Sequence, residues 1–400
     1  MTDINLPPAF PFPYHERRLA PEFADRRKSC PFGTVRLQSG HDAVLLVRNA
    51  DVAAALADTR LSHNMTAPGS PRFVEGPSYL DDPTMFANME GAEHRRIRRI
   101  IASAFTPQSI ANWHPMIEQV ATELAEALDH GGNRADVMSD FCIPLPVTII
   151  RRLIGVPESD APQFRAWSNA FVSGAKMTLE QRIQQMTEFT GYVAELIAYK
   201  RAHPGTDLID KLISTRDGDD RLSEPELVTL VTSTIAGGNE TTSNSLGRHL
   251  LTLLDDDGAL WKQLVADQDL IPAAVDELLR TTKLGAFFPM RLATEDVDLP
   301  SGRILEGQAV VVAVASGLRD ETVYPDPETV KLDRPQVPTL AFGRGPHTCL
   351  GINLALAELR IGLRVLVERF PSLRLDCDAD ELRYTEGGLL SSLVSLPLAW

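Results

Sequence analysis

One cysteine stands in a setting that suits chemistry better than packing. The segment from Phe342 to Cys349 reads FGRGPHTC, with glycines at Gly343 and Gly345. These glycines let the backbone turn sharply and pass close to a flat group. An apolar helical pattern begins at Leu350, and the positive end of such a helix favours a thiolate. A thiolate held beneath a planar group is what an axial haem ligand requires. A buried structural thiol is the alternative.

A second group of reactive side chains lies inside a long helical pattern. The pattern begins at Ser223 with the capping box SEPE and continues to Leu254. It contains the segment 237–242, GGNETT, in which Glu240 and Thr241 are adjacent. Two glycines ahead of an acid and two threonines are a poor composition for an ordinary helix, which is the alternative interpretation. A carboxyl beside a hydroxyl can relay protons, so this segment is a candidate for proton delivery.

Two further spacings place charged side chains on one face of a helix. Glu277 and Arg280 are three residues apart, and His94 and Arg98 are four apart. Taken singly, such residues are most often surface ion pairs or solvated charges, which contribute little to stability. They indicate a functional site only when they are taken together with the cysteine segment and with the segment 237–242.

These four segments, in their order along the chain, resemble the motifs of the cytochrome P450 family. The cysteine segment is similar to that family's haem-binding loop, Phe-Gly-x-Gly-x-His-x-Cys-x-Gly, and 237–242 is similar to its oxygen-activation signature. The resemblance extends from about Leu45 to the C-terminus. It implies haem b (iron protoporphyrin IX) as cofactor, with Cys349 as axial ligand of the iron. It also implies electrons from NAD(P)H through external redox partners.

The resemblance assigns roles to the residues of the central and following helices. Thr241 and Glu240 would deliver the protons that the reduction of oxygen consumes. The backbone at Gly238 would contact the cofactor and loosen where the central helix crosses the haem face. Glu277, Arg280 and Arg334 would form a buried network behind the cysteine loop, because a buried carboxylate needs such pairing.

The resemblance also implies a set of cofactor contacts. Haem carries two propionates, which require cations or hydrogen-bond donors. The predicted contacts to the cofactor are His94, Arg98, Arg291, His347, Phe342 and Gly343. The chain departs from the family's pattern at Glu90-Gly91-Ala92, where Asp-Pro-Pro is common. We expect this departure to change the turn before the helix and not the propionate contacts.

The patterns predict a mainly α-helical fold with small β-sheets. By resemblance this is the cytochrome P450 fold, with the haem buried between a long central helix and the cysteine-loop helix. Runs rich in valine and leucine at 43–47, 309–314 and 393–398 are expected to form one small sheet. We expect a single catalytic domain over 1–400. Its β-rich part lies at about 33–60, 289–320 and 384–400, and its helical part at about 61–288 and 350–370.

Composition and charge limit the partners. A net charge of -15 argues against nucleic acid or an anionic membrane surface. The four cysteines are widely spaced, so we expect reduced thiols. The N-terminal stretch has no apolar run that could be a signal peptide or cross a bilayer. We therefore expect a cytoplasmic protein without membrane attachment, similar to the soluble bacterial members of the family.

A local basic face suggests an electron partner. It comprises Arg95, Arg96, Arg99 and Arg344 in an otherwise acidic chain. Such a face can steer an acidic redox protein toward the haem, and a merely solubilising helix is the alternative. No flavin or iron–sulfur module is evident in the sequence. The resemblance therefore implies a separate ferredoxin and ferredoxin reductase.

Substrate contacts can be placed only by resemblance. The expected segments are 62–87, 164–186, the central helix before Gly238, 283–288 and 386–393. Two of these segments are apolar, which suits a hydrophobic small molecule. Their candidate pocket residues are Leu284, Ala286, Phe287, Phe288, Leu389 and Leu390. The two phenylalanines fit a role as core aromatics equally well.

Three functions compete. The first is a monooxygenase that inserts one atom of O2 into a hydrophobic small molecule by hydroxylation or epoxidation, in natural-product metabolism. The second uses the same haem site for oxidative C–C or C–N coupling of aromatic substrates, or for a peroxide-driven reaction. The intact Glu240-Thr241 pair argues against peroxide use and says less about coupling. The third is a haem sensor without enzymatic activity, which would need an output module or a nucleic-acid surface, and neither is visible.

Overall fold

The chain forms two compact units in the computed structural model. The structure describes residues 7–12, 17–72, 83–172, 178–215, 221–282, 289–335, 337, 339–385 and 391–400. Unit 1 comprises Met1–Arg95, Gly285–Val330 and Gln336–Cys349, and unit 2 comprises Arg96–Leu284, Lys331–Pro335 and Leu350–Trp400. The single catalytic domain over 1–400 stays a prediction. Among the described helices, none combines the length and the apolar character needed to cross a membrane.

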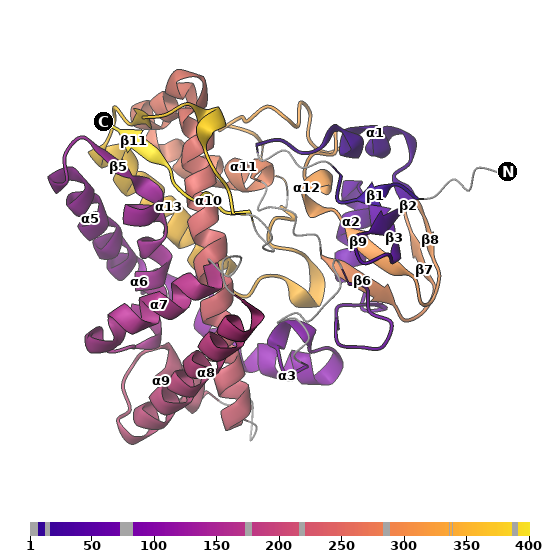
Figure 1. The fold of residues 1–400 in the computed structure, drawn as a ribbon, viewed down its shortest axis with the longest axis horizontal. Coiled ribbons are helices and arrows are strands. Elements are labelled where there is room, and N and C mark those ends of the chain that lie inside the picture. Colours follow the sequence, from indigo (N-terminus) through magenta and orange to yellow (C-terminus); the bar gives the residue numbers. More distant parts are fainter. Residues whose placement is uncertain are drawn as a thin grey trace. The chain divides into compact units, whose positions relative to one another are not determined.

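Unit 1 is built on a mixed sheet (Figure 1). Within the described residues its strands are, in order across the sheet, β1 (Ala9–Phe10), β2 (Phe32–Leu37), β3 (Asp42–Leu46), β9 (Ala309–Val312), β6 (Met290–Ala293) and β4 (Leu61–Ser62). β3 and β9 are parallel neighbours, with Ala43 opposite Ala309. The strands predicted at 43–47 and 309–314 are therefore confirmed. β7 (Val297–Leu299) and β8 (Gly302–Ile304) form a separate pair.

The alternation of side chains along this sheet divides the core of unit 1 in two. One cluster combines Val44 and Val310 with apolar residues of α2 (Asn49–Ala57). The other combines Leu45 and Val311 with Phe23 of α1 (Pro21–Ser29). Both faces of the central strands are buried, which explains why they read as continuous apolar runs. α12 (Val314–Gly317) follows β9 and packs on α2.

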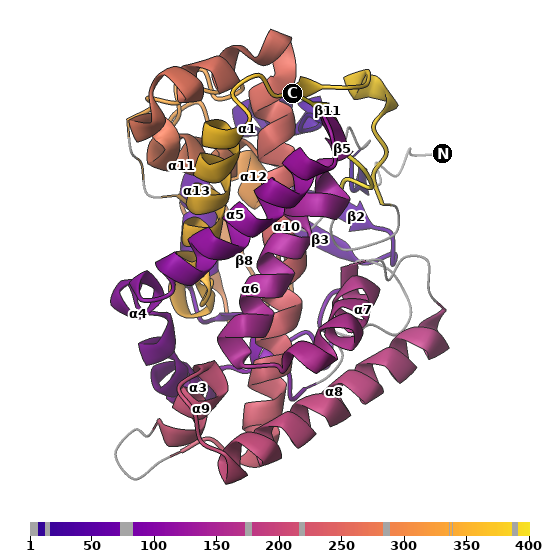
Figure 2. The same ribbon diagram turned by 90° about the vertical axis from the view of Figure 1, so that its left-hand side faces the viewer.

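Unit 2 is helical and is organised around α10 (Glu224–Ala266), as Figures 1 and 2 show. Its other helices are α4 (Pro107–Ala111), α5 (His114–His130), α6 (Pro144–Ile154), α7 (Ala161–Val172), α8 (Leu179–Ala202), α9 (Leu208–Ser214), α11 (Ile271–Thr281) and α13 (Ile352–Arg369). α6, α7, α8, α11 and α13 contact α10. α3 (Gly91–Ala102) begins in unit 1 and ends in unit 2.

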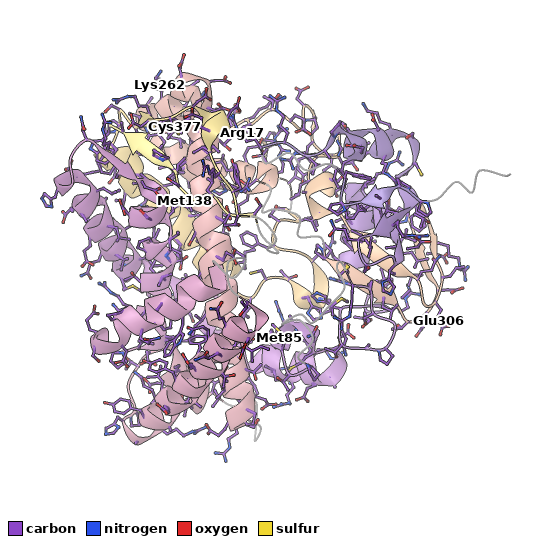
Figure 3. All side chains as sticks on the ribbon, in the orientation of Figure 1. Arg17, Met85, Met138, Lys262, Glu306 and Cys377 are labelled. Carbon is purple, nitrogen blue, oxygen red and sulfur yellow. The ribbon has the colours of Figure 1, made fainter. Side chains whose placement is uncertain are left out.

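A short π-helical turn, Met138–Cys142, also packs on α10. Figure 3 shows the Met138 side chain beside this helix. A Cβ atom on Gly247 would collide with the Met138 sulfur, so Gly247 permits the close approach. Apart from β5 (Arg134–Asp136), the described residues between 107 and 280 are therefore mainly helical, in agreement with the helical part expected at about 61–288.

α10 begins where its sequence predicts. The Ser223 hydroxyl accepts from the Glu226 N–H, and the Glu226 carboxylate accepts from the Ser223 N–H, which completes a capping box. The backbone leaves helical geometry at Asp255–Gly258, directly after the predicted end at Leu254. The helix is therefore unbroken through 237–242, the candidate proton-delivery segment.

The expected loosening of the backbone at Gly238 is not observed. Residues 237 and 238 are regular helix, and the Thr241 hydroxyl donates to the Gly237 carbonyl over 2.7 Å. A Cβ atom on Gly238 would lie 2.9 Å from Cδ1 of Ile150, on α6. Because glycine has no side chain, it lets α6 approach α10 closely at this position.

The strand prediction at 393–398 was wrong in its extent and in its partner, because only Pro397 and Leu398 of this run are in a strand. The run 393–398 was expected to join the sheet at 43–47 and 309–314. Instead β11 (Pro397–Ala399) pairs with β10 (Arg374–Leu375) and β5 (Arg134–Asp136), all in unit 2. Leu393 forms an isolated bridge with Tyr384. A run of valine and leucine indicates a strand but carries no information about which distant strand it pairs with.

α13 carries a buried carboxyl group. Glu358 is 1% exposed, and its Oε1 atom has no hydrogen-bond partner among the described residues. Burial disfavours the charged form, so it raises the pKa of Glu358 to about 8. The carboxyl is therefore protonated in the folded protein at neutral pH, while in the unfolded chain it is ionised.

This difference makes stability depend on pH. From about pH 5 to pH 8 the unfolded chain has released a proton that the folded protein keeps, so the free energy of unfolding falls as pH rises, by up to roughly 1.4 kcal/mol per unit. We expect Glu358→Gln to remove this slope and to gain stability over wild type toward pH 8. Urea unfolding from pH 5 to pH 8.5 measures it, with Glu368→Gln on the exposed side of α13 as control. A difference between Glu358→Gln and wild type that is constant with pH contradicts the prediction.

Candidate functional site

The cysteine loop of unit 1 has the tight turns that its glycines predict. Gly343 and Gly345 have φ angles of +73° and +78°, in the left-handed region that glycine favours. The Cys349 N–H donates to the Phe342 carbonyl over 2.8 Å and closes the loop. A Cβ atom on Gly345 would lie 2.7 Å from the Cα of Ala57, so the loop packs directly on the end of α2.

The thiol at the end of this loop is accessible. Cys349 is exposed, whereas Cys142 is buried and burial raises the pKa of its thiol. A buried structural thiol, the alternative for Cys349, does not fit this exposure. α13 begins at Ile352, two residues later than predicted, which is within the usual uncertainty of a helix end. Phe342 is half-buried in the same loop.

Imidazole and guanidinium groups gather elsewhere in unit 1. The rings of His94 and His347 stack with centroids 4.4 Å apart, and His63 meets the His347 ring edge-on at 4.7 Å. Arg291 lies on β6 and is 4% exposed. Burial and then the Arg291 charge lower the pKa of His63, so the Arg291 guanidinium lies within electrostatic range of this imidazole. Three of these residues were predicted as propionate contacts, and the structure brings them together.

This cluster fits the carboxylates of a haem. Burial lowers the pKa of Arg291 to about 10, although the Glu90 charge opposes this. A buried guanidinium requires polar or anionic partners. Arg291 donates one N–H to the Met290 carbonyl over 2.8 Å, and among the described residues no carboxylate forms an ion pair with it. Most of its five donors are therefore available to an anion such as a propionate.

The turn before α3 explains the departure at Glu90-Gly91-Ala92. The Glu90 carboxylate accepts from the Ser62 hydroxyl over 2.7 Å and from the His63 N–H over 2.6 Å. Gly91 has a φ angle of +63°, which favours glycine. Glu90 therefore ties the chain at 62–63 to the start of α3. His94 is buried on that helix, and Arg98 follows four residues later and is half-buried.

The predicted Glu277 network is present in unit 2. The Glu277 carboxylate accepts from Arg280 over 2.7 and 2.8 Å, from Arg334 over 2.9 and 3.0 Å, and from the Lys331 N–H over 3.1 Å. Glu277 is 4% exposed. Burial alone would raise the pKa of Glu277, but these donors lower it below its usual value. The three side chains thus form a charged structural support and not a surface ion pair.

The Glu240-Thr241 pair lies on α10 in unit 2. Burial raises the pKa of Glu240 to about 7, although a hydrogen bond from Ser392 opposes the rise. The Ser392 hydroxyl donates to Glu240 Oε1 over 3.2 Å. The half-buried Thr241 hydroxyl donates its proton to Gly237, so its lone pairs remain as acceptors. A carboxyl that exchanges its proton near neutral pH suits a relay.

Gly237 and Gly238 differ in what surrounds them. A Cβ atom on Gly237 would meet nothing within 4 Å, whereas Gly238 faces Ile150. Gly237 therefore borders open space one turn before Thr241. The contact predicted between Gly238 and the cofactor stays a prediction.

The structure does not describe any of the predicted pocket residues, which are Leu284, Ala286, Phe287, Phe288, Leu389 and Leu390.

Two polar residues of the site were missed by the sequence analysis. Ser392 reaches Glu240 across 152 residues of sequence, and His63 joins the imidazole cluster. No local signal marks either residue. The polar spacing of Glu240, Asn244 and Arg248 along α10 could have suggested a buried polar partner.

The basic face is only partly available to a partner. Arg95 and Arg344 are exposed in unit 1, and Arg99 is exposed in unit 2. Arg96, however, forms an ion pair with Glu226 of the α10 capping box. Arg96 thus has a structural partner, and the prediction of an electron-partner surface depends on the other arginines.

Comparison with known proteins identifies similar sequences along nearly the whole chain. The family model described as cytochrome P450 matches residues 149–392, more than half of the chain. The mycinamicin IV hydroxylase/epoxidase of Micromonospora griseorubida is 35% identical over 406 residues, covering 98% of this chain and 99% of the relative. The nocardicin C N-oxygenase of Nocardia uniformis subsp. tsuyamanensis is also 35% identical, covering 96% of each chain.

Solved structures are similar over the same extent. A crystal structure of the cytochrome P450 hydroxylase from the leinamycin biosynthetic pathway of Streptomyces atroolivaceus S-140 matches with a TM-score of 0.92. Its sequence is 34% identical, and the match covers 98% of this chain and 100% of that one. The similarity of fold therefore extends well beyond the motif segments.

Proposed function

This chain belongs to the cytochrome P450 family, and we propose that it hydroxylates or epoxidises a hydrophobic natural product. Membership makes it a haem-dependent monooxygenase, an oxidoreductase of the EC 1.14 type that uses haem b and takes electrons from NAD(P)H through redox partners. The observation that carries the proposal is the similarity over nearly the full chain to a hydroxylase/epoxidase. The exposed Cys349 at the end of its glycine loop supports it.

We assign the haem to groups that the fold already holds in place. The Cys349 sulfur would be the axial ligand of the iron. Arg291, His347 and His94 would bind the propionates, and Arg98, four residues after His94 on α3, would add a further cation. The Glu277 network would hold 331–334, the part of the chain leading to the cysteine loop. When bound, the haem supplies the redox chemistry that activates O2.

Proton delivery is assigned to Glu240 and Thr241. The Glu240 carboxyl is in part protonated at neutral pH, because its pKa is about 7. Ser392 holds Oε1, so Oε2 is the atom that carries the exchangeable proton. The Thr241 hydroxyl can accept a hydrogen bond on its lone pairs while Gly237 takes its own proton, or turn to donate one. The proposed relay would use the Glu240 carboxyl and the Thr241 hydroxyl in turn, and a water molecule would have to join them, because consecutive side chains of a helix do not face each other.

Electrons would come from a separate ferredoxin and ferredoxin reductase in the cytoplasm. The exposed Arg95 and Arg344 of unit 1 support this partner, because exposed cations attract an acidic redox protein and raise its association rate. High salt is expected to slow electron transfer to the haem for the same reason.

Natural-product oxidation is supported by the relatives. Their names describe a mycinamicin hydroxylase/epoxidase, a nocardicin N-oxygenase and a hydroxylase of leinamycin biosynthesis. All three names describe oxygen insertion. Oxidative coupling of aromatic substrates, the alternative outcome, gains no support from these relatives.

The experiment is a screen followed by isotope labelling. Macrolides, modified peptides and terpenes are titrated against the ferric holoenzyme, and the change of spin state on binding identifies a substrate. Turnover with NAD(P)H, a ferredoxin and its reductase under ¹⁸O2 should then yield a product with one labelled oxygen atom. A product that has lost two hydrogens and carries no label would refute oxygen insertion.

A further inference from the structure

One face of α10 carries polar side chains at intervals of one turn. Glu240, Asn244 and Arg248 are spaced four residues apart, so they share a face of the helix. Asn244 is 1% exposed and Arg248 is 6% exposed. Buried polar side chains persist only where partners satisfy them. This stripe therefore has a specific counterpart inside unit 2.

The counterpart is the C-terminal segment around Ser391 and Ser392. The Asn244 amide donates to the Ser391 carbonyl over 3.0 Å, and Arg248 donates to the same carbonyl over 2.6 Å. Arg248 also donates to the Asn244 side-chain oxygen over 3.2 Å. Its guanidinium carbon lies 4.8 Å above the ring of Tyr384. The backbone at Ser391 is thus clamped to α10 by two buried side chains.

Ser392 is fixed from its other side as well. Its carbonyl accepts from the Thr385 N–H over 2.8 Å, and its N–H donates to the Thr385 hydroxyl over 3.0 Å. Ser392 is 4% exposed. With both backbone groups bound, its side chain has little freedom, and its hydroxyl donates to Glu240 Oε1. A rigid donor therefore faces the carboxyl that we assign to proton delivery.

We propose that Ser392 is a positioning residue for proton delivery: its hydroxyl, held by the Asn244–Arg248 clamp, fixes the orientation of the Glu240 carboxyl and stabilises its ionised form. The inference rests on the role proposed for Glu240. A donor to Oε1 favours the carboxylate over the acid, whereas burial favours the acid. The two effects oppose each other, and their balance leaves both forms populated near neutral pH.

Other charges do not account for this balance. Burial and the Ser392 hydroxyl are the causes of the Glu240 pKa shift, and within the described residues no charged group on α6, α8, α13 or the C-terminal segment contributes to it. Arg248 lies two turns after Glu240 on α10, and its guanidinium contacts Ser391, Asn244 and Tyr384. Ser392 is therefore the group whose removal should shift the titration of Glu240.

The test is an infrared pH titration of the ferric holoenzyme. The C=O stretching band of protonated Glu240 is identified as the band that Glu240→Gln removes. We expect its midpoint near pH 7 in wild type. In Ser392→Ala it should move up by about one pH unit, the size expected for the loss of a hydrogen bond to a charged group. Ser392→Thr, which keeps the hydroxyl, should restore it.

Two further variants complete the test. Ser243→Ala removes a buried hydroxyl of α10 that bonds only within its own helix, to the Asn239 carbonyl, and it should leave the midpoint unchanged. Arg248→Gln keeps Ser392 and Glu240 but weakens the clamp, so it should shift the midpoint upward by less. This variant keeps the proposal testable if Ser392→Ala does not fold. An unchanged midpoint in both Ser392→Ala and Arg248→Gln would overturn the proposal.

A second readout separates this inference from the role of Glu240 itself. Protonated Glu240 is the donor, so the yield of product per NAD(P)H should decline as pH rises through its pKa. In Ser392→Ala the decline should move to higher pH by the same interval as the infrared midpoint. If Glu240→Gln leaves that yield unchanged at every pH, the proposed role of Glu240 fails, while the infrared result still decides whether Ser392 controls the carboxyl.

Discussion

Cys349→His is expected to retain haem binding and to lose the strongly red-shifted Soret band of the reduced carbonyl complex. A thiolate donates electron density to the iron that an imidazole does not, and the shifted band depends on this donation. Monooxygenase turnover should fall to background with it. The measurement is an absorption spectrum of the reduced protein under carbon monoxide, with haem content determined separately. The substitution changes the ligand on an accessible loop end, so the fold should tolerate it.

Cys30→His is the matched control. Cys30 is also an exposed cysteine of unit 1, and it lies outside the loop, so the shifted band should persist in this variant. If the shifted band persists in Cys349→His, Cys349 is not the axial ligand of the iron. The haem would then have no assigned place at the end of this loop.

Thr241→Ala is expected to bind substrate normally and to divert reducing equivalents to peroxide. We expect product formed per NAD(P)H to fall by about 100-fold, at the low end of what a positioned proton donor contributes. The Thr241 hydroxyl bonds to Gly237 within its own helix, so its loss should not disturb tertiary packing. Spin-state titration measures binding, and peroxide and product are assayed against NAD(P)H consumed.

Two threonine variants isolate the hydroxyl. Thr241→Ser keeps it and should recover most of the coupling. Thr242→Val removes a neighbouring hydroxyl that is buried and not assigned to the relay, and it should couple as wild type does. If Thr241→Ala yields as much product per NAD(P)H as wild type, Thr241 has no part in proton delivery.

Much of the fold could be predicted because its signals are local. The capping box at Ser223 and the end of helical geometry after Leu254 depend on residues within one turn, and both are observed. The strand at 43–47 reads as apolar because both of its faces are buried. The partner of 393–398 could not be predicted, because strand pairing depends on segments far apart in the chain.

The chemistry of the site divides in the same way. The reactive groups can be recognised from the amino-acid sequence alone: a cysteine after glycines, an acid beside a threonine, and a glutamate three residues before an arginine. Their types and spacing are covalent properties of the chain, so no fold is needed to recognise them.

The charge and the contacts of those groups, by contrast, depend on the folded chain. Arg280 and Arg334 hold the pKa of Glu277 below its usual value, and burial raises the pKa of Glu240 to about 7 against the effect of the Ser392 hydrogen bond. Folding also brings Ile150 against Gly238 and pairs Arg96 with Glu226. Burial and hydrogen-bond donors set the charge of a side chain, and both come from residues distant in sequence, as Ser392 and Glu240 are.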